Sequence, residues 1–207
     1  MKVIVVTDPM CSWCWGMSPA VEEAAARLAG KVEFDLLLGG VNTTTTRPVG
    51  EYARRYLMHV WREVHAVTGQ TFAFQVPDGL VYNSTAPCLA LAAVRRASGR
   101  PPFGYLHRLQ QLLFAEARNI NDPDLLAATA TEFGVAADVV RRGLADPTLA
   151  AALRVELNQA RRHGTSQLPH VLIEQDGQRS LLAGGYADGP MLEALIRERL
   201  GGAQPRK

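Results

Sequence analysis

Short apolar runs at the start of the chain predict a β-α-β unit. Residues 3–6 form a β-branched run, and residues 32–38 form a second apolar segment. Between them, residues 19–28 carry apolar side chains at the spacing of one helical face, and Gly30 marks the end of that helix. A crossover of this length favours parallel pairing of the two strands.

The end of the chain returns to strand-like patterning. The apolar runs 171–174 and 180–183 are separated by a polar segment that contains Asp176-Gly177, a dipeptide typical of two-residue hairpin turns. A final helical pattern begins at Asp188 and keeps its apolar side chains on one face. These residues therefore predict a β-β-α unit.

Between these two units the hydrophobic period is helical. Two of the expected helices begin with a typical N-cap sequence: Asp122 and Asp146 each precede a proline at the first helical position. The expected helices cover residues 51–67, 89–97, 105–117, 123–133 and 147–163, with Gly164 as the last stop. The pattern thus predicts one α/β domain, built from residues 1–45 and 165–207, that is interrupted by an all-helical insertion at residues 46–164.

Charge and composition narrow the function classes. The 207 residues include 22 Lys or Arg and 20 Asp or Glu, so the formal net charge is +2. The basic residues occur as scattered pairs, which argues against a nucleic-acid partner. The apolar start is too short for a secretory signal, and no segment approaches the ~18 apolar residues of a membrane span. We therefore expect a cytoplasmic protein with no membrane contact.

The three cysteines are too few for a disulfide-stapled secreted scaffold, and two of them form the candidate chemical centre. Cys11 and Cys14 are three residues apart, so on a helical turn their sulfurs can reach each other. They lie between a strand and a helix start, where unpaired backbone N–H groups favour a thiolate. We expect Cys11 to be the nucleophile and Cys14 the thiol that resolves a mixed disulfide.

Two other interpretations of this pair stay open. A structural zinc site would need two further ligands, but the chain has no second C-x-x-C motif. Its histidines are scattered, at positions 59, 65, 107, 163 and 170. The pair could also be two inert, buried cysteines in a tight turn. We favour the redox interpretation and expect no metal.

The segment from Asp8 to Gly16 resembles the active-site segment of the DsbA-like branch of the thioredoxin superfamily. Pro19 is similar to the proline that kinks active-site helices in that superfamily, and we expect it to separate a short motif turn from the helix proper. Residues 61–70 and 82–88 resemble the FrnE-like group of predicted protein-disulfide isomerases.

The resemblance implies a thioredoxin fold, β-α-β followed by β-β-α, with a helical insertion. It also implies a protein disulfide oxidoreductase or isomerase that exchanges disulfides with protein or peptide thiols through Cys11 and Cys14. No bound cofactor is expected, because the cysteine pair carries the two electrons; glutathione is a candidate redox partner.

The resemblance further implies a cis peptide bond between Leu168 and Pro169 that faces the thiol pair. From the sequence alone, Pro169 is equally compatible with a trans proline at the start of a strand. His170 departs from the family, where a small polar residue such as Thr is more usual. Its imidazole either raises the thiolate fraction or relays a proton, or it simply packs into the sheet.

Residues around the motif have two interpretations each. Asp8 either accepts a proton from Cys14 or organises the turn, and we favour the turn. Ser12 and Trp13 carry no charge that would set the reduction potential. Trp13 is expected at the surface as an apolar platform for unfolded substrate, whereas Trp15 is expected to pack.

Three aromatic residues of the first inserted helix are candidates for a groove: Tyr52, Tyr56 and Trp61. We expect core packing for at least two of them. Cys88, near the start of another helix, is expected to be a small buried hydrophobe; the alternative is a third redox thiol.

Two other function classes remain. Kappa-class glutathione transferases and hydroxychromene carboxylate isomerases share the insertion topology, but they generally keep a serine where this chain has Cys11. The non-enzymatic alternative is a metal-binding or redox-sensing module.

Overall fold

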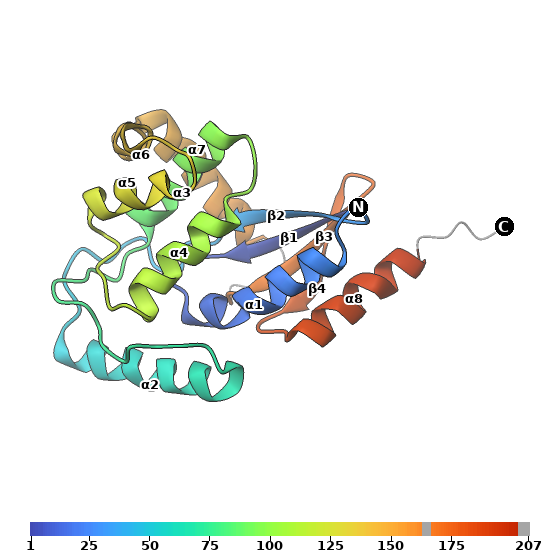
Figure 1. The fold of residues 1–207 in the computed structure, drawn as a ribbon, viewed down its shortest axis with the longest axis horizontal. Helices are drawn as coiled ribbons and strands as arrows, with labels where there is room; N and C mark the ends of the chain where they lie inside the picture. Colours follow the sequence, from blue (N-terminus) through green and yellow to red (C-terminus); the bar gives the residue numbers. More distant parts are fainter. Residues whose placement is uncertain (163–166, 203–207) are drawn as a thin grey trace.

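The computed structural model describes residues 1–162 and 167–202, and within them four strands form a single mixed sheet. The strands lie in the order β2-β1-β3-β4 (Figure 1). Their bounds are β1 Lys2–Thr7, β2 Glu33–Leu38, β3 His170–Gln175 and β4 Gln178–Gly184. β1 pairs with β2 in parallel and with β3 antiparallel, and β3 pairs antiparallel with β4. The predicted parallel pairing of the first two strands is confirmed.

The hairpin between β3 and β4 follows from two residues. Asp176 and Gly177 have φ angles of 52° and 75°, so both adopt the left-handed conformation that a type I′ turn requires. This turn matches the right-handed twist of the flanking strands, which explains why Asp-Gly predicts the hairpin from the sequence.

Two layers of helix cover the sheet. On one face, α1 (Ser12–Arg27) and α8 (Gly189–Gly202) bury a cluster that includes Val3, Val5, Leu192 and Ile196 (Figure 1). On the other face, the end of α7 (Pro147–Ala160) packs Ala160 into a small cluster with side chains of β1, β2 and β3. Both faces of the central strand are therefore buried, as its continuous apolar run predicts.

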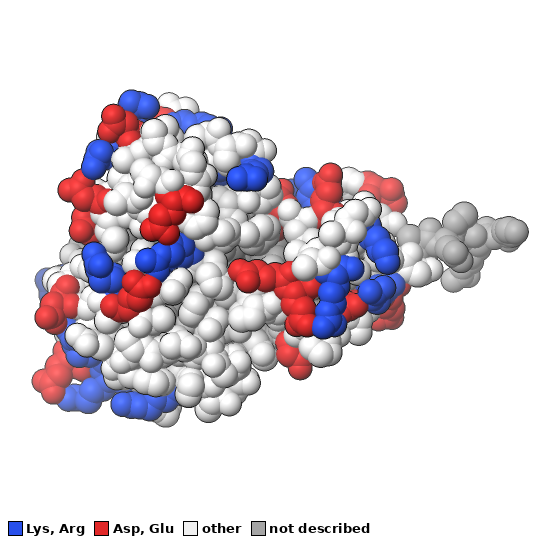
Figure 2. All heavy atoms as spheres, in the orientation of Figure 1, with Lys and Arg blue, Asp and Glu red and all other residues white. Residues whose placement is uncertain are grey.

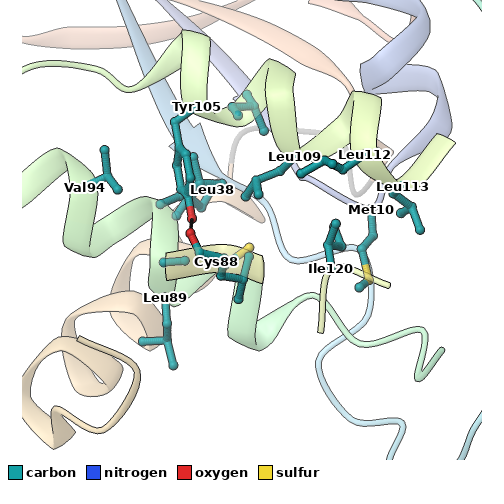
Figure 3. Close-up of a cluster of buried hydrophobic side chains, with 14 of the residues drawn as sticks. Met10, Leu38, Cys88, Leu89, Val94, Tyr105, Leu109, Leu112, Leu113 and Ile120 are labelled. Carbon is teal, nitrogen blue, oxygen red and sulfur yellow. Dashed lines mark hydrogen bonds between the residues drawn. The ribbon is translucent and has the colours of Figure 1, made fainter. Parts of the chain in front are cut away.

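The remaining helices form a block that lies between β2 and β3 in the chain. Their bounds are α2 Glu51–Thr68, α3 Thr85–Ser98, α4 Phe103–Phe114, α5 Pro123–Thr131 and α6 Ala137–Leu144. Their core is continuous with the sheet domain, because Met10 and Leu38 pack among side chains of α3 and α4 (Figure 3). The expected domain boundaries at 45/46 and 164/165 stay predictions; residue 164, the expected helix stop, lies outside the described residues.

The first helix begins earlier than expected, at Ser12, and runs through Pro19 without a break in its assignment. A proline at this position removes the N–H that would bond to the Trp15 carbonyl. Two other donors satisfy that carbonyl: Ser18 Oγ at 2.8 Å and Gln70 Nε2 at 3.1 Å. These bonds explain how the helix tolerates the proline, and the expected separation into a turn and a helix is wrong.

The surface agrees with the absence of a dense basic patch in the sequence. On the face shown in Figure 2, acidic and basic side chains are interspersed. In the described part of the chain, no helix is both long enough and apolar enough to cross a membrane.

Candidate active site

Cys11 ends the loop after β1 and forms the N-cap of α1. Its backbone is extended, with φ −86° and ψ 112°, and its sulfur accepts a hydrogen bond from the Cys14 backbone N–H at 3.2 Å. A side-chain acceptor at this position satisfies one of the free N–H groups of the helix start. The structure therefore brings the Cys11 sulfur against the first turn of α1, and both motif cysteines are free thiols.

An open hollow of about 400 Å³ lies in front of Cys11. Its walls come from the motif itself, the loop after β2, helix α2, the segment before α3, the end of α7 and the start of β3. The lining side chains include Ser12, Trp13, Val41, Tyr56, Leu57, Val60, Tyr82, Arg161, Leu168 and His170. Cys11 is thus the thiol that a substrate in this hollow would meet.

Cys14 does not line the hollow of Cys11. It lines a narrow hollow of about 30 Å³, together with Pro169, His107 and Gln110. Burial raises the pKa of the Cys14 thiol well above its ordinary value, and the neighbouring Cys11 and Asp8 raise it further. Both side chains are nearly buried, Cys11 at 5% and Cys14 at 4% exposed, but they line different hollows, a wide one and a narrow one.

The peptide bond between Leu168 and Pro169 is cis. Leu168 lines the hollow of Cys11, and Pro169 lines the narrow hollow of Cys14. The structure therefore places this dipeptide beside both thiols, where the resemblance implies that a substrate chain is received.

His170 is buried at the start of β3, with Nδ1 3.0 Å from the Gln167 carbonyl oxygen. It also lines the hollow of Cys11. The side chain is therefore both packed in the sheet and adjacent to the thiol, and its role in catalysis stays a prediction.

Asp8 is completely buried, and its carboxylate joins three segments of the chain. Oδ1 accepts the Met10 N–H at 2.7 Å, which is the turn expected from Asp-Pro. Oδ2 accepts the Val41 N–H at 2.9 Å and the Ser84 hydroxyl at 2.7 Å. Burial raises the pKa of Asp8, although these hydrogen bonds to the charged form oppose the effect.

Cys88 lies beside this carboxylate. Its sulfur is 3.7 Å from Asp8 Oδ2 and is fully buried among apolar side chains of α3 and α4 (Figure 3). Burial, followed by the negative charge of Asp8, raises the pKa of the Cys88 thiol well above its ordinary value. These surroundings are those of a packed thiol rather than a reactive one.

The aromatic side chains only partly follow the sequence expectations. Trp13 is half-buried beside the Cys11 hollow, and its ring lies 6.0 Å from that of Tyr186. Trp15 is buried and donates its indole N–H to the Thr71 carbonyl.

The expectation for the three aromatic residues of helix α2 differs from the structure. Trp61 is fully buried, but Tyr52 and Tyr56 are 80% and 61% exposed. The expectation that at least two of these three pack in the core is therefore wrong. Helix α2 buries only a narrow stripe, formed by Leu57, Trp61 and Val64, so both tyrosines project outside it.

Sequence reasoning missed several contacts of the site. The Tyr82 hydroxyl donates to the Met10 carbonyl at 2.5 Å, and Gln110 Nε2 donates to the Asp8 carbonyl at 3.2 Å. Gln110 had a detectable signal, since it is a polar residue on the apolar face shared by Leu106 and Leu113. Tyr82 and Ser84 lie in a segment recognised only by resemblance.

Metal ligands are not grouped in this structure. Across residues 1–162 and 167–202, no three His, Cys, Asp or Glu side chains cluster closely enough to hold a metal ion.

The strand order, the thiol pair at the start of α1 and the neighbouring cis proline define a thioredoxin-fold protein with a helical insertion. A family model for the DSBA-like thioredoxin domain matches residues 2–196, and the chain belongs to that family.

Solved structures support the fold. A protein from Nitrosomonas europaea, provisionally named a protein disulfide isomerase, is 23% identical and superposes with a TM-score of 0.88 over 98% of each chain. The cytosolic disulfide reductase DsbM from Pseudomonas aeruginosa is 24% identical, with a TM-score of 0.77 over 98% of this chain and 100% of that one.

A curated relative carries a different name. The ClpXP adapter protein SpxH of Halalkalibacterium halodurans is 22% identical over 187 residues. The match covers 85% of this chain but only 59% of that protein, so this chain spans about three fifths of the relative's length.

Proposed function

We propose that the chain is a thiol–disulfide oxidoreductase that exchanges disulfides with protein or peptide thiols through Cys11 and Cys14. The observation that carries the proposal is the asymmetry of the pair. Cys11 caps a helix, receives the Cys14 N–H at 3.2 Å and faces a hollow of about 400 Å³. Cys14 lines a separate, narrow hollow. This difference supports attack by Cys11 and resolution by Cys14.

The chemistry is balanced by the two thiols alone. The Cys11 thiolate attacks a substrate disulfide, forms a mixed disulfide and releases one substrate thiolate. Deprotonated Cys14 then attacks the Cys11 sulfur, which forms the Cys11–Cys14 disulfide and releases the second substrate thiolate. The substrate gains two electrons and the protein loses them; the reverse sequence oxidises a dithiol.

Trapping tests this division of roles. Cys14→Ser should accumulate a mixed disulfide through Cys11, because nothing resolves it. Cys11→Ser should abolish exchange with a small disulfide substrate. Full activity of Cys11→Ser would overturn the assignment. An adaptor like the SpxH proteins would instead bind its partner equally well in both variants, so a pull-down with each variant separates the two functions.

Glutathione is the small thiol that we propose as a redox partner. A hollow of about 400 Å³ falls within the range of small-ligand sites, and Arg161 supplies a cation on its wall for the carboxylates of the tripeptide. The P. aeruginosa reductase has also been solved with GSH. Arg161→Gln should raise the KM for glutathione, whereas Arg162→Gln, its sequence neighbour that does not line the hollow, should leave the KM unchanged.

The preferred direction is reduction or isomerisation in a reducing compartment. Under those conditions a reactive cysteine pair rests mostly as the dithiol, which reduces or reshuffles substrate disulfides. Equilibration with defined glutathione buffers, followed by thiol labelling of Cys11 and Cys14, gives the reduction potential. A potential as oxidising as that of a bulk disulfide-forming oxidase, about −120 mV, would overturn this direction while leaving the exchange function intact.

The kappa-class-like alternative predicts a different outcome. A glutathione transferase or isomerase of that branch would turn over its substrate without cycling through a Cys11–Cys14 disulfide. If Cys14→Ser retained full turnover with no trapped intermediate, this alternative would replace the oxidoreductase proposal.

A further inference from the structure

Resolution by Cys14 requires a proton acceptor that the thiol pair does not supply. The Cys14 side chain is only 4% exposed, and its thiol must lose a proton before it can attack the Cys11 sulfur. Burial raises the pKa of this thiol, so spontaneous ionisation is disfavoured. The proton therefore needs a path from an enclosed sulfur to solvent.

Asp8 is the nearest buried carboxylate along the chain, but its position does not suit this task. Its two oxygens already accept hydrogen bonds from the backbone of Met10 and Val41 and from Ser84. The residue is also 0% exposed, so a proton delivered there would remain inside the protein. Asp8 holds the loop together rather than connecting Cys14 to water.

The narrow hollow beside Cys14 is the candidate proton path. Its volume of about 30 Å³ is large enough for an ordered water molecule. Most of its lining surface is apolar, but Thr7, Ser18, Glu22, His107 and Gln110 also line it. A water there therefore depends on the few polar atoms that face the hollow.

Gln110 gives independent support for a bound water. The residue is 1% exposed, and its Oε1 has no hydrogen-bond partner among the described residues, although its Nε2 donates to the Asp8 carbonyl. A buried amide oxygen of this kind is normally satisfied by protein or water. Because Gln110 lines the hollow beside Cys14, a water there completes its hydrogen bonding.

His107 and Glu22 both line the hollow, and the Glu22 side chain is 57% exposed. His107 Nδ1 lies 3.0 Å from Glu22 Oε1, although the contact lacks the alignment of a hydrogen bond. The His107 ring is fixed by edge contact with Trp15, 5.0 Å between ring centroids. The titratable groups near Cys14 are Cys11, Asp8 and Tyr82, together with His107 and Glu22 on the hollow. Glu22 is the charged group that lies against His107.

We propose that this hollow is the route by which the Cys14 proton leaves during resolution. A water held by Gln110 Oε1 accepts the proton, and the His107–Glu22 pair passes it to solvent. The Cys14 thiolate then attacks the Cys11 sulfur and expels the substrate thiolate, as described for the proposed function, on which this route rests. His107, Glu22 and Gln110 are positioning and relay residues, because none of them contacts the reacting disulfide.

The two steps are separable with 5,5′-dithiobis(2-nitrobenzoate) and the full reduced chain. Attack by Cys11 releases one equivalent of coloured thiolate at a rate that depends on reagent concentration. Resolution by Cys14 releases a second equivalent at a rate that does not. His107→Phe and Glu22→Gln should leave the first phase unchanged and slow the second by about tenfold. This is less than the roughly 10²–10⁴-fold typical of a lost acid or base, because water remains in place.

The pH profile distinguishes a relay from a packing effect. The ratio of wild-type to variant rates in the second phase should be largest near neutral pH and shrink in alkaline buffer, where hydroxide replaces the relay. Gln110→Met should also slow only the second phase. A change in its first phase would show that the substitution disturbs the loop that contains Asp8. Glu23→Gln is the matched control, because Glu23 lies next to Glu22 on α1 but pairs with Arg27.

The outcomes are distinct. If the wild-type chain shows both phases and the variants show an unchanged second phase, the proposed route is wrong while the proposed function stands. If the wild-type chain releases no second equivalent, the proposed function itself is wrong. Because Glu22 is on the surface, its variant tests the route even if Gln110→Met does not fold.

Discussion

Gly39 and Leu168 approach so closely that a methyl group on Gly39 would lie 2.6 Å from Leu168 Cδ1. A side chain at residue 39 fits this space only if the Leu168 side chain moves. The Gly39 backbone is held on the other side, because its N–H donates to the Thr7 carbonyl at 2.8 Å. The absence of a side chain at residue 39 therefore leaves the room that the Leu168 side chain occupies beside Cys11.

Gly39→Ala should consequently displace the Leu168 side chain, which lines the hollow of Cys11. We expect the unfolding free energy to fall by about 1–3 kcal/mol, which is typical of overpacking. We also expect slower exchange with a peptide disulfide, because this side chain moves relative to Cys11. Chemical denaturation and single-turnover exchange measure the two effects.

Two variants control this experiment. Gly50→Ala adds a methyl group where nothing lies within 4 Å and replaces only the glycine N-cap of α2, so it should cost less than Gly39→Ala and leave exchange unchanged. Leu168→Ala in the Gly39→Ala background removes the colliding side chain and should recover part of the lost stability. Additive effects of the two substitutions would mean that the contact is not the cause.

The buried carboxylate of Asp8 predicts a pH-dependent contribution to stability. Its pKa is raised in the folded protein, so the folded state binds this proton more tightly than the unfolded state. Its stabilising contribution is therefore fully present below the unfolded value near 3.8 and is lost as pH rises through the folded pKa. In Asp8→Asn this component disappears.

The measurement is the difference in unfolding free energy between wild type and Asp8→Asn across acidic pH. The unfolding free energy of the wild type minus that of Asp8→Asn should decrease as pH rises from below 3.8. Asp138→Asn, at an exposed aspartate, is the control. A difference independent of pH would contradict a raised pKa.

Much of this fold is predictable from local patterns. Local sequence patterns predict the strands, the Asp-Gly hairpin and the capped helix at Pro123, because these elements depend on side chains that are close in sequence. Helix α6 has no clear signal in the sequence, because it is only eight residues long and its N-cap, Ala136, has no side chain that can form a capping hydrogen bond. Its Gly143 also weakens the helical signal, although in the fold it allows close packing against Ala93.

In the candidate site too, features set by local sequence are predictable, and features set by contacts between distant residues are not. Cys11 and Cys14 are recognised because their chemistry depends on local spacing. The bonds from Ser84 and Val41 to Asp8 join residues that are distant in sequence, and no periodicity reports such contacts. The exposure of Tyr56 is not predictable from the sequence for a similar reason, because it depends on which other helices pack against α2.

The three cysteines should differ in reactivity toward iodoacetamide. Cys11 faces the open hollow, whereas Cys88 is 0% exposed and its thiol pKa is raised well above the ordinary value. In the folded, reduced protein, Cys11 should be alkylated first, and Cys88 only after unfolding in denaturant. Peptide mapping by mass spectrometry reports each site. Equal labelling of Cys11 and Cys88 in the native state would show that Cys88 is more than a packed thiol.

The two exposed tyrosines of α2 provide a matched test of where substrate binds. Tyr56 lines the hollow of Cys11, whereas Tyr52, one turn earlier and 80% exposed, does not. Tyr56→Ala should remove apolar contact with a peptide substrate, which corresponds to roughly 1 kcal/mol of binding or about a fivefold rise in KM. Its kcat should stay unchanged, since the thiols are untouched. Tyr52→Ala should leave both constants unchanged. Equal rises in KM for both variants would place the peptide along the outside of α2 rather than in the hollow.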